Sequence, residues 1–192
     1  MSQPQMSSMG RLMLQRQLAK MERDPPNGFS IGLVDENDIT KWQILVEGPE
    51  DTIWEGGFFP ATLEYVLFRS QILDQSIKSV CGRFPPEFPQ KPPTMRFTMP
   101  DFWHPNVYPD GRVCISILHD PEHDPLNQQE SIDEKWRPVL GVEEILVSVV
   151  SMLADPNCDS PANVDASVQF RNDYPAFKKR IRRLARRSME ML

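Results

Sequence analysis

Eight prolines fall between Pro85 and Pro109, and they restrict this part of the 192-residue chain more than any other feature does. Proline lacks a backbone N–H and fixes φ, so most of this stretch forms neither a regular helix nor a central strand. Aromatic residues are interleaved with the prolines, at Phe84, Phe88, Phe97, Phe102 and Trp103. Because such side chains favour burial, we expect a long ordered loop here and not a disordered tail.

The composition is typical of a single soluble domain over residues 1–192, with 40% hydrophobic and 25% charged residues. The three cysteines lack the spacing of a metal site or a disulfide framework, which favours a reducing compartment. The N-terminus does not read as a signal peptide, and the most apolar run, 145–154, is too short to span a bilayer. We therefore expect a protein of the cytosol or nucleus, without a cofactor, that reaches the endoplasmic reticulum only through a partner.

Hydrophobic periodicity predicts a helix, four strands and three further helices, which is an α+β pattern with helices packed on one side of an antiparallel meander. The expected helices cover residues 8–21, 142–154, 165–170 and 174–189, and the expected strands cover 29–34, 42–46, 58–65 and 94–97. The second helix has the clearest apolar face, formed by Val142, Ile145, Leu146, Val149, Met152 and Leu153.

The segment 104–118, which reads HPNVYPDGRVCISIL, carries the candidate chemistry. Two prolines and a glycine favour a rigid loop, and Asp110-Gly111 is a turn signal that lets the chain fold back. Cys114 then lies near an amide donor, Asn106, and a thiol beside such a donor is suited to attack on an acyl carbon with stabilisation of the oxyanion.

His-Pro-Asn at 104–106 followed by Cys114 and Ile-x-Ile-Leu resembles the active-site signature of ubiquitin-conjugating enzymes. Further blocks resemble the family in the same order, at 23–26, Trp42, 55–60, 89–93, 136–138 and 151–157. The resemblance implies an α+β fold with an N-terminal helix, a four-stranded meander, a long active-site loop and C-terminal helices. It also implies an ATP-dependent pathway of protein degradation, in which ubiquitin is carried as a thioester and passed to lysine.

By this resemblance Cys114 is the nucleophile, with His104 and Pro105 as structural support. Asn106 either stabilises the oxyanion as lysine attacks or holds the active-site loop, and the sequence leaves both roles open. Asp159 and Ser160 fall on the gate beside the cysteine. Many relatives carry an acid at the Ser160 position that helps orient or deprotonate the incoming lysine, and here Asp159 is the only acid of the pair. A polar loop end is the alternative at these two positions.

Residues 119–135 resemble the acidic loop of one subclass of these enzymes, which comprises the G-type class and a cell-cycle enzyme with an acidic tail. Residues 160–166 further favour the G-type class. His119 and Asp124 lie within the acidic loop, and its negative charge is suited to attracting a lysine amine. A loop that only improves solubility is the alternative. A zinc site from His119, His123 and Cys114 is disfavoured, because Pro121 prevents the helix that this histidine spacing needs.

The resemblance implies four kinds of partner: ubiquitin, its activating enzyme, a RING-type ligase and protein substrates. Arg11, Arg16 and Lys20 would face the activating enzyme, while Gln90 and Pro138 fall on the ligase-binding loops. Relatives carry an aromatic residue at the Gln90 position. A net charge of −6 argues against general nucleic-acid binding, and we interpret the seven bases of 178–187 as the solvated face of a helix.

Residues 65–83 interrupt the family pattern, since Glu64 would lead smoothly into Phe84 without them. They have two explanations: an inserted loop with a stripe of Leu73, Ile77 and Val80, or a retained short intron, because the codons can supply splice-like ends. Loop-closure entropy grows slowly with length, so the fold should tolerate such an insertion.

Two other functional classes remain. The first is a catalytically impaired binding module that keeps the fold, which requires that the insertion disrupt the ligase face. The second is a cysteine hydrolase, which needs a base, and the candidate considered for that base is His104, ten residues before Cys114.

Overall fold

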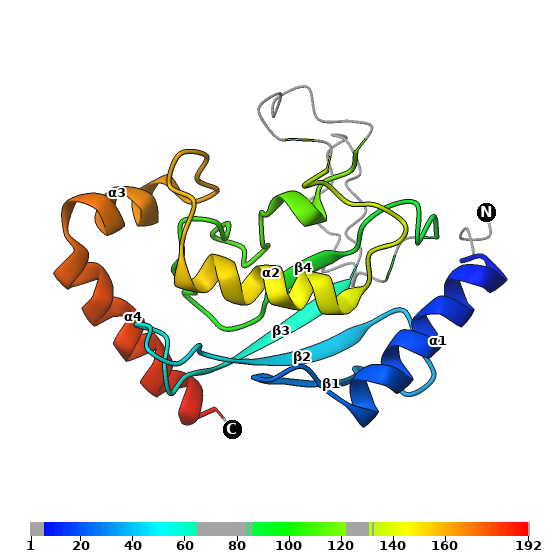
Figure 1. Ribbon diagram of the computed structural model, residues 1–192. Helices are drawn as coiled ribbons and strands as arrows, with labels where there is room; N and C mark the ends of the chain where they lie inside the picture. Colours follow the sequence, from blue (N-terminus) through cyan, green and yellow to red (C-terminus); the bar gives the residue numbers. More distant parts are fainter. Residues whose placement is uncertain (1–5, 65–83, 85, 122–130, 132, 192) are drawn as a thin grey trace, which may run out of the picture.

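The computed structural model describes residues 6–64, 84, 86–121, 131 and 133–191. The elements follow the expected order: α1 (Ser8–Arg23), β1 (Phe29–Leu33), β2 (Trp42–Glu47), β3 (Phe58–Glu64), β4 (Thr94–Phe97), a short 3-10 helix η1 (Ser116–Leu118), α2 (Val142–Ala154), α3 (Val164–Asn172) and α4 (Tyr174–Met189). The strands form one antiparallel sheet in the order β1-β2-β3-β4, so the predicted α+β meander is confirmed (Figure 1). The bounds of β4, α2 and α4 are as predicted, whereas η1 was not expected.

Successive side chains along a strand point to opposite faces of the sheet, so every second residue of these strands points into the core. Ile44 lies opposite Ala61, and Val46 lies opposite Phe59, in the register of β2 with β3. All four side chains are at most 2% exposed. The same face of β3 continues onto β4, where Leu63 lies opposite Met95. A sheet with one buried face needs a covering layer, and the apolar side of α2 supplies it.

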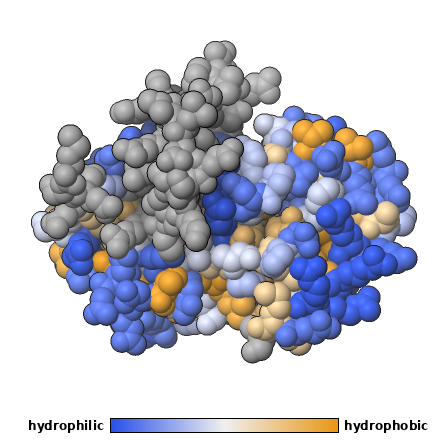
Figure 2. Space-filling view, turned by 180° about the vertical axis from the view of Figure 1, so that it is seen from behind, coloured by the Kyte–Doolittle hydropathy of each residue, from blue (hydrophilic) through white to orange (hydrophobic). Residues whose placement is uncertain are grey.

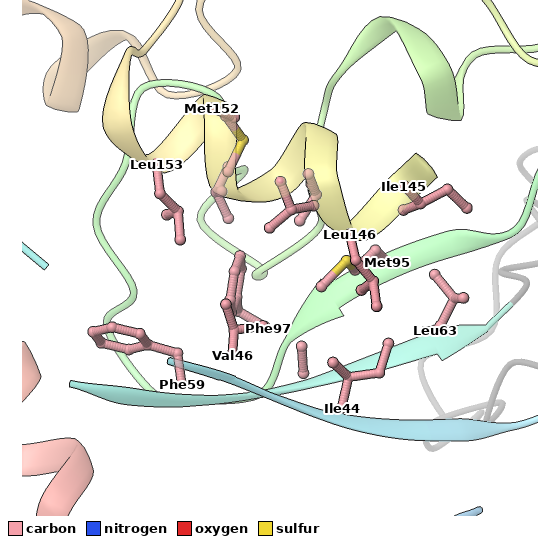
Figure 3. Packing of buried hydrophobic residues seen from close by; sticks show 14 of the residues in the cluster. Ile44, Val46, Phe59, Leu63, Met95, Phe97, Ile145, Leu146, Met152 and Leu153 are labelled. Carbon is pink, nitrogen blue, oxygen red and sulfur yellow. The ribbon is translucent and has the colours of Figure 1, made fainter. Parts of the chain in front are cut away.

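Helix α2 crosses this buried face of the sheet (Figure 1). The six apolar residues predicted to share one side of α2 are all buried, at no more than 6% exposure. Figure 3 shows Leu146 and Leu153 pointing from the helix toward Met95, Phe97 and Phe59 on the strands. Burial of each such side chain contributes on the order of 2 kcal/mol, so this contact holds the central helix in place.

Helices α1 and α4 flank the sheet at opposite ends and do not cover its face, which corrects the expectation that all helices pack on one side (Figure 1). Helix α1 contacts β1, and α4 contacts β3. Helix α1 also holds the start of α2, because the Gln17 side chain accepts a hydrogen bond of 2.9 Å from the Val142 N–H. This bond satisfies one of the orphan donors of α2, whose N-cap residue, Gly141, has no side chain.

The basic run on α4 is the solvated side of an amphipathic helix, as interpreted from the sequence. Phe177, Ile181 and Leu184 are buried beneath it, while Lys179 and Arg183 are exposed. Seen from behind, the end of the molecule formed by α3 and α4 is largely hydrophilic (Figure 2). Within the described residues, none of the helices combines the length and apolar character needed to cross a membrane.

The proline-rich stretch is an ordered loop around β4, as expected. Phe84 is buried and its ring lies 5.5 Å from that of Trp42, while its N–H donates to the Thr40 carbonyl at 2.6 Å. Trp136 joins this loop to the segment before α2, because its indole N–H donates to the Pro89 carbonyl at 2.7 Å. The insertion at 65–83 and the centre of the acidic loop lie outside the described residues.

Candidate active site

The segment that carries Cys114 folds back on itself, as the Asp110-Gly111 turn predicts. Gly111 has a φ of +89°, which favours glycine, and a Cβ there would lie 2.2 Å from the Phe97 carbonyl oxygen. Val107 and Val113 form an antiparallel bridge across the turn. The Cys114 N–H then donates to the Asn106 carbonyl at 2.9 Å, which brings the predicted nucleophile beside the predicted amide.

The half-buried Cys114 lines a cavity of about 150 Å³. Both sides of the cavity come from distant parts of the chain: Asn106, Ile115, Ser116 and His119 from the catalytic loop, and Met152, Asp155, Asn157 and Ser160 from the end of α2 and the segment after it. The Nε2 atom of His119 lies 3.5 Å from the Cys114 sulfur. A thiol, an imidazole and several polar groups therefore share one small, open site.

His104 is fully buried and serves as a structural bridge. Its Nδ1 accepts a hydrogen bond from the Asn106 N–H at 2.9 Å, so its Nε2 carries the proton that it donates to the Met152 carbonyl at 3.1 Å. Burial lowers the pKa of His104 from 6.5 to about 3, with the bond to Met152 opposing the shift. A neutral imidazole with both nitrogens occupied and no exposure cannot serve as a base for Cys114.

Asn106 is also buried, and its side chain bonds the backbone of Asn157 twice. Its Nδ2 donates to the Asn157 carbonyl at 2.8 Å, and its Oδ1 accepts from the Asn157 N–H at 2.8 Å. This pair ties the catalytic loop to the segment after α2. An amide nitrogen has two N–H donors, and the bond to Asn157 uses one, so the geometry accommodates both predicted roles of Asn106.

The two predicted gate residues point to different places. Ser160 lines the cavity beside Cys114, whereas the Asp159 carboxylate lies 2.6 Å from the Arg171 guanidinium and does not line it. The backbone of this segment is fixed, since the Asn157 Oδ1 accepts from the Asp159 N–H at 2.9 Å. The acidic residue that does line the cavity is Asp155, which the sequence did not indicate.

The residues predicted to bind partners lie at the surface. Arg11, Arg16 and Lys20 are exposed on α1, and the Lys20 ammonium pairs with Glu143 at the start of α2. The hydrogen bond to Glu143 holds the pKa of Lys20 above its ordinary value. Gln90 and Pro138 are exposed on the two loops that the Trp136–Pro89 hydrogen bond joins.

Asp124, His123 and Cys81 lie outside the described residues. The prediction of an active-site role for Asp124 therefore stays a prediction. Sequence reasoning also missed two residues that hold site residues in place: Asn157, which bonds the Asn106 side chain, and Arg171, which pairs with Asp159. Asn157 belongs to the block 151–157 that resembles the family, but the resemblance assigned it no role. Arg171 is a single arginine in a polar helix, which gave no signal.

Residues 13–66 and 79–185 match the family of ubiquitin-conjugating enzymes, and the unmatched residues 67–78 fall within the predicted insertion. The chain is 47% identical over 186 residues to ubiquitin-conjugating enzyme E2 15 of Schizosaccharomyces pombe, which covers 97% of this chain and 99% of that relative. It is 50% identical over 179 residues to probable ubiquitin-conjugating enzyme E2 7 of Caenorhabditis elegans, covering 93% and 96%. It is 43% identical over 176 residues to human ubiquitin-conjugating enzyme E2 G2, covering 92% and 94%.

Most of the chain thus matches one family, and the sheet, the helix order and the cysteine loop agree with it. The chain belongs to the ubiquitin-conjugating enzyme family. It is an acyltransferase that carries ubiquitin as a thioester and transfers it to lysine, and its relatives include the G-type class that its motifs resemble.

Proposed function

We propose that Cys114 is the residue that accepts ubiquitin from the activating enzyme. The observation that carries this assignment is the position of its sulfur, half-buried in an open cavity beside Asn106 and His119. The thiolate attacks the carbonyl carbon of the incoming thioester and expels the sulfur of the activating enzyme. When the lysine amine then attacks the carbonyl carbon of the Cys114 thioester, the Cys114 sulfur is the leaving group.

The residues around Cys114 serve the second transfer. Asn106 holds the segment at Asn157 and presents its remaining N–H toward the developing oxyanion. Asp159 and Ser160 form the gate through which the lysine enters, with Asp159 as the group that binds its ammonium. His119, whose Nε2 lies 3.5 Å from the sulfur, positions the thiol. His104 and Pro105 are both buried, and they support the loop that carries Cys114 from within the core.

Exposed residues at the end of the molecule that carries α1 bind the two partner enzymes. Arg11, Arg16 and Lys20 on α1 bind the activating enzyme, and the neighbouring loops that carry Gln90 and Pro138 bind a RING-type ligase. The end bearing α1 lies far from α4, so neither partner needs the basic side of α4 (Figure 1).

The pathway, the acidic loop and the location of the protein complete the proposal. The acidic loop at 119–135, including Asp124, attracts the lysine amine electrostatically. The reaction supports ATP-dependent protein degradation in the cytosol or nucleus, and recruitment to the endoplasmic reticulum depends on a partner.

A hydrolase remains the second candidate, because one observation favours it. His104 is excluded as its base by burial and by its two hydrogen bonds, but His119 lies within reach of the thiol. A Cys–His pair that activated water would release free ubiquitin in place of an adduct.

Charging with activating enzyme, ATP and ubiquitin, analysed with and without reductant, tests the assignment. Wild-type protein should form one reducible adduct, and Cys114→Ala should form none. Cys158→Ala and Cys81→Ala are the matched controls and should charge normally. A full adduct on the Cys114→Ala variant would refute the assignment, and free ubiquitin released without lysine would favour the hydrolase.

A further inference from the structure

The gate acid Asp159 is paired with a residue of helix α3. The Arg171 guanidinium nitrogen lies 2.6 Å from the Asp159 Oδ1, and the two side chains are 52% and 96% exposed. Arg171 lies in the last turn of α3 and has no part in the cavity beside Cys114. The pair therefore holds the carboxylate on the α3 side of the gate, while its neighbour Ser160 faces the cavity.

The backbone around the gate is anchored independently of this ion pair. The Asn157 Oδ1 accepts from the N–H of Asp159 at 2.9 Å and from that of Ser160 at 3.4 Å. The Ser167 hydroxyl of α3 donates to the Cys158 carbonyl at 3.5 Å. Loss of the ion pair consequently frees the Asp159 side chain without removing the contacts that hold the gate in position.

We propose that Arg171 is a positioning residue that acts as a latch on Asp159 and restrains the transfer of ubiquitin to lysine. The inference rests on the proposed function, in which Asp159 binds the ammonium of the incoming lysine. Arg171 and the lysine ammonium compete for one carboxylate, so lysine engages Asp159 only when the latch opens. Loading of Cys114 involves no lysine acceptor and does not depend on the latch.

The exposure of the pair sets the size of the effect. Ion pairs that water surrounds are worth at most about 1 kcal/mol, which corresponds to a factor of about five in an equilibrium constant. The latch therefore opens readily, and it tunes the transfer without abolishing it. Its removal should accelerate transfer to free lysine by about two- to fivefold.

The test measures discharge of preformed thioester to free lysine for Arg171→Gln, with Arg171→Lys as the conservative variant. Arg187→Gln is a matched control, because Arg187 forms another exposed ion pair, with Asp101 at 3.3 Å, and its loss changes the charge equally. Arg171→Gln should discharge faster than wild type, while Arg187→Gln and Arg171→Lys stay close to wild type. The acceleration should vanish when Asp159→Asn is also present.

A second acceptor separates the latch from a general loosening of the gate. Hydroxylamine is largely uncharged near neutral pH and gains nothing from a freed carboxylate, so Arg171→Gln should not accelerate its reaction. Equal acceleration with both acceptors, or an acceleration that persists with Asp159→Asn, would refute the latch. So would an unchanged or slower discharge of the Arg171→Gln variant to lysine.

Failure of the proposed function gives different results. A wild-type protein without a reducible adduct would remove the role of Cys114 itself. A protein that charges normally, but whose Asp159→Asn variant discharges like wild type, would remove the role of Asp159 and overturn the latch, while leaving Cys114 as the carrier.

Discussion

Acidification should destabilise this protein through one buried residue, His104. The folded state holds its imidazole neutral, with a pKa lowered by burial from 6.5 to about 3. Protonation would also place an N–H on Nδ1, where the Asn106 N–H already donates, so that two donors would face each other. Between these two pKa values the unfolded chain binds a proton that the folded chain does not, and stability falls as the pH decreases.

The size of the effect follows from the two pKa values. The stability difference changes by about 1.4 kcal/mol per pH unit inside this window and levels off outside it. Between pH 7.0 and pH 4.5 the contribution of His104 to stability should decrease by about 2.5 kcal/mol. Such a change is a large fraction of the stability of an ordinary domain, which is on the order of 5–15 kcal/mol.

Carboxylates also titrate in acid, so the assay compares wild type with His104→Gln to isolate the contribution of the imidazole. The glutamine amide still offers one donor and one acceptor group but does not titrate. Urea unfolding at pH 7.0, 5.5 and 4.5 gives both stabilities. The variant should be less stable at pH 7.0, because it loses packing and hydrogen bonds, and the gap should close by about 2.5 kcal/mol at pH 4.5. Parallel loss of stability in the two proteins would refute the assigned pKa of His104.

Two further predictions concern the neighbouring loop and the insertion. Asn106→Ala should load ubiquitin nearly normally but discharge it to lysine about 10- to 1000-fold more slowly in a single-turnover assay, if Asn106 donates to the oxyanion. Equal loss of both steps would instead show that it only holds Asn157. Deletion of 65–83 should leave a folded enzyme that charges on Cys114, because the two sides of the insertion lie close together. Leu63 pairs with Trp42 in the register of β2 with β3, and the ring of Phe84 contacts that of Trp42. Thermal unfolding and charging of the deletion variant test this, and an unfolded variant would contradict it.

Most of the fold could be predicted because local periodicity and burial agree. The apolar spacing of α2 and α4 matches the residues that the structure buries, and Asp155-Pro156 marks the end of α2. Helix ends were harder to predict. Helix α3 begins at Val164 because the Asn163 side chain caps it by accepting from the Ala166 N–H, which apolar periodicity does not reveal.

The residues of the candidate site could be predicted where they are close in sequence or, for Ser160, where the family resemblance indicated them. Cys114 and Asn106 belong to one motif and one turn, and the structure brings them together. The partners of the motif were not predicted, since Met152 contributes only a backbone carbonyl and Asn157 contributes its backbone groups. Backbone groups have no sequence signature, so such contacts appear only once the tertiary structure is known.

The position of α2 links the two ends of this enzyme. The start of α2 is held by Gln17 on α1, near the residues proposed to bind the activating enzyme. Its last turn holds His104 through the Met152 carbonyl, and the segment after it holds Asn106 through Asn157. Thirteen helical residues span about 20 Å, and a helix packed in a dense core moves as a body. A partner at α1 that shifted α2 would thus reach the catalytic loop through the bonds to His104 and Asn106.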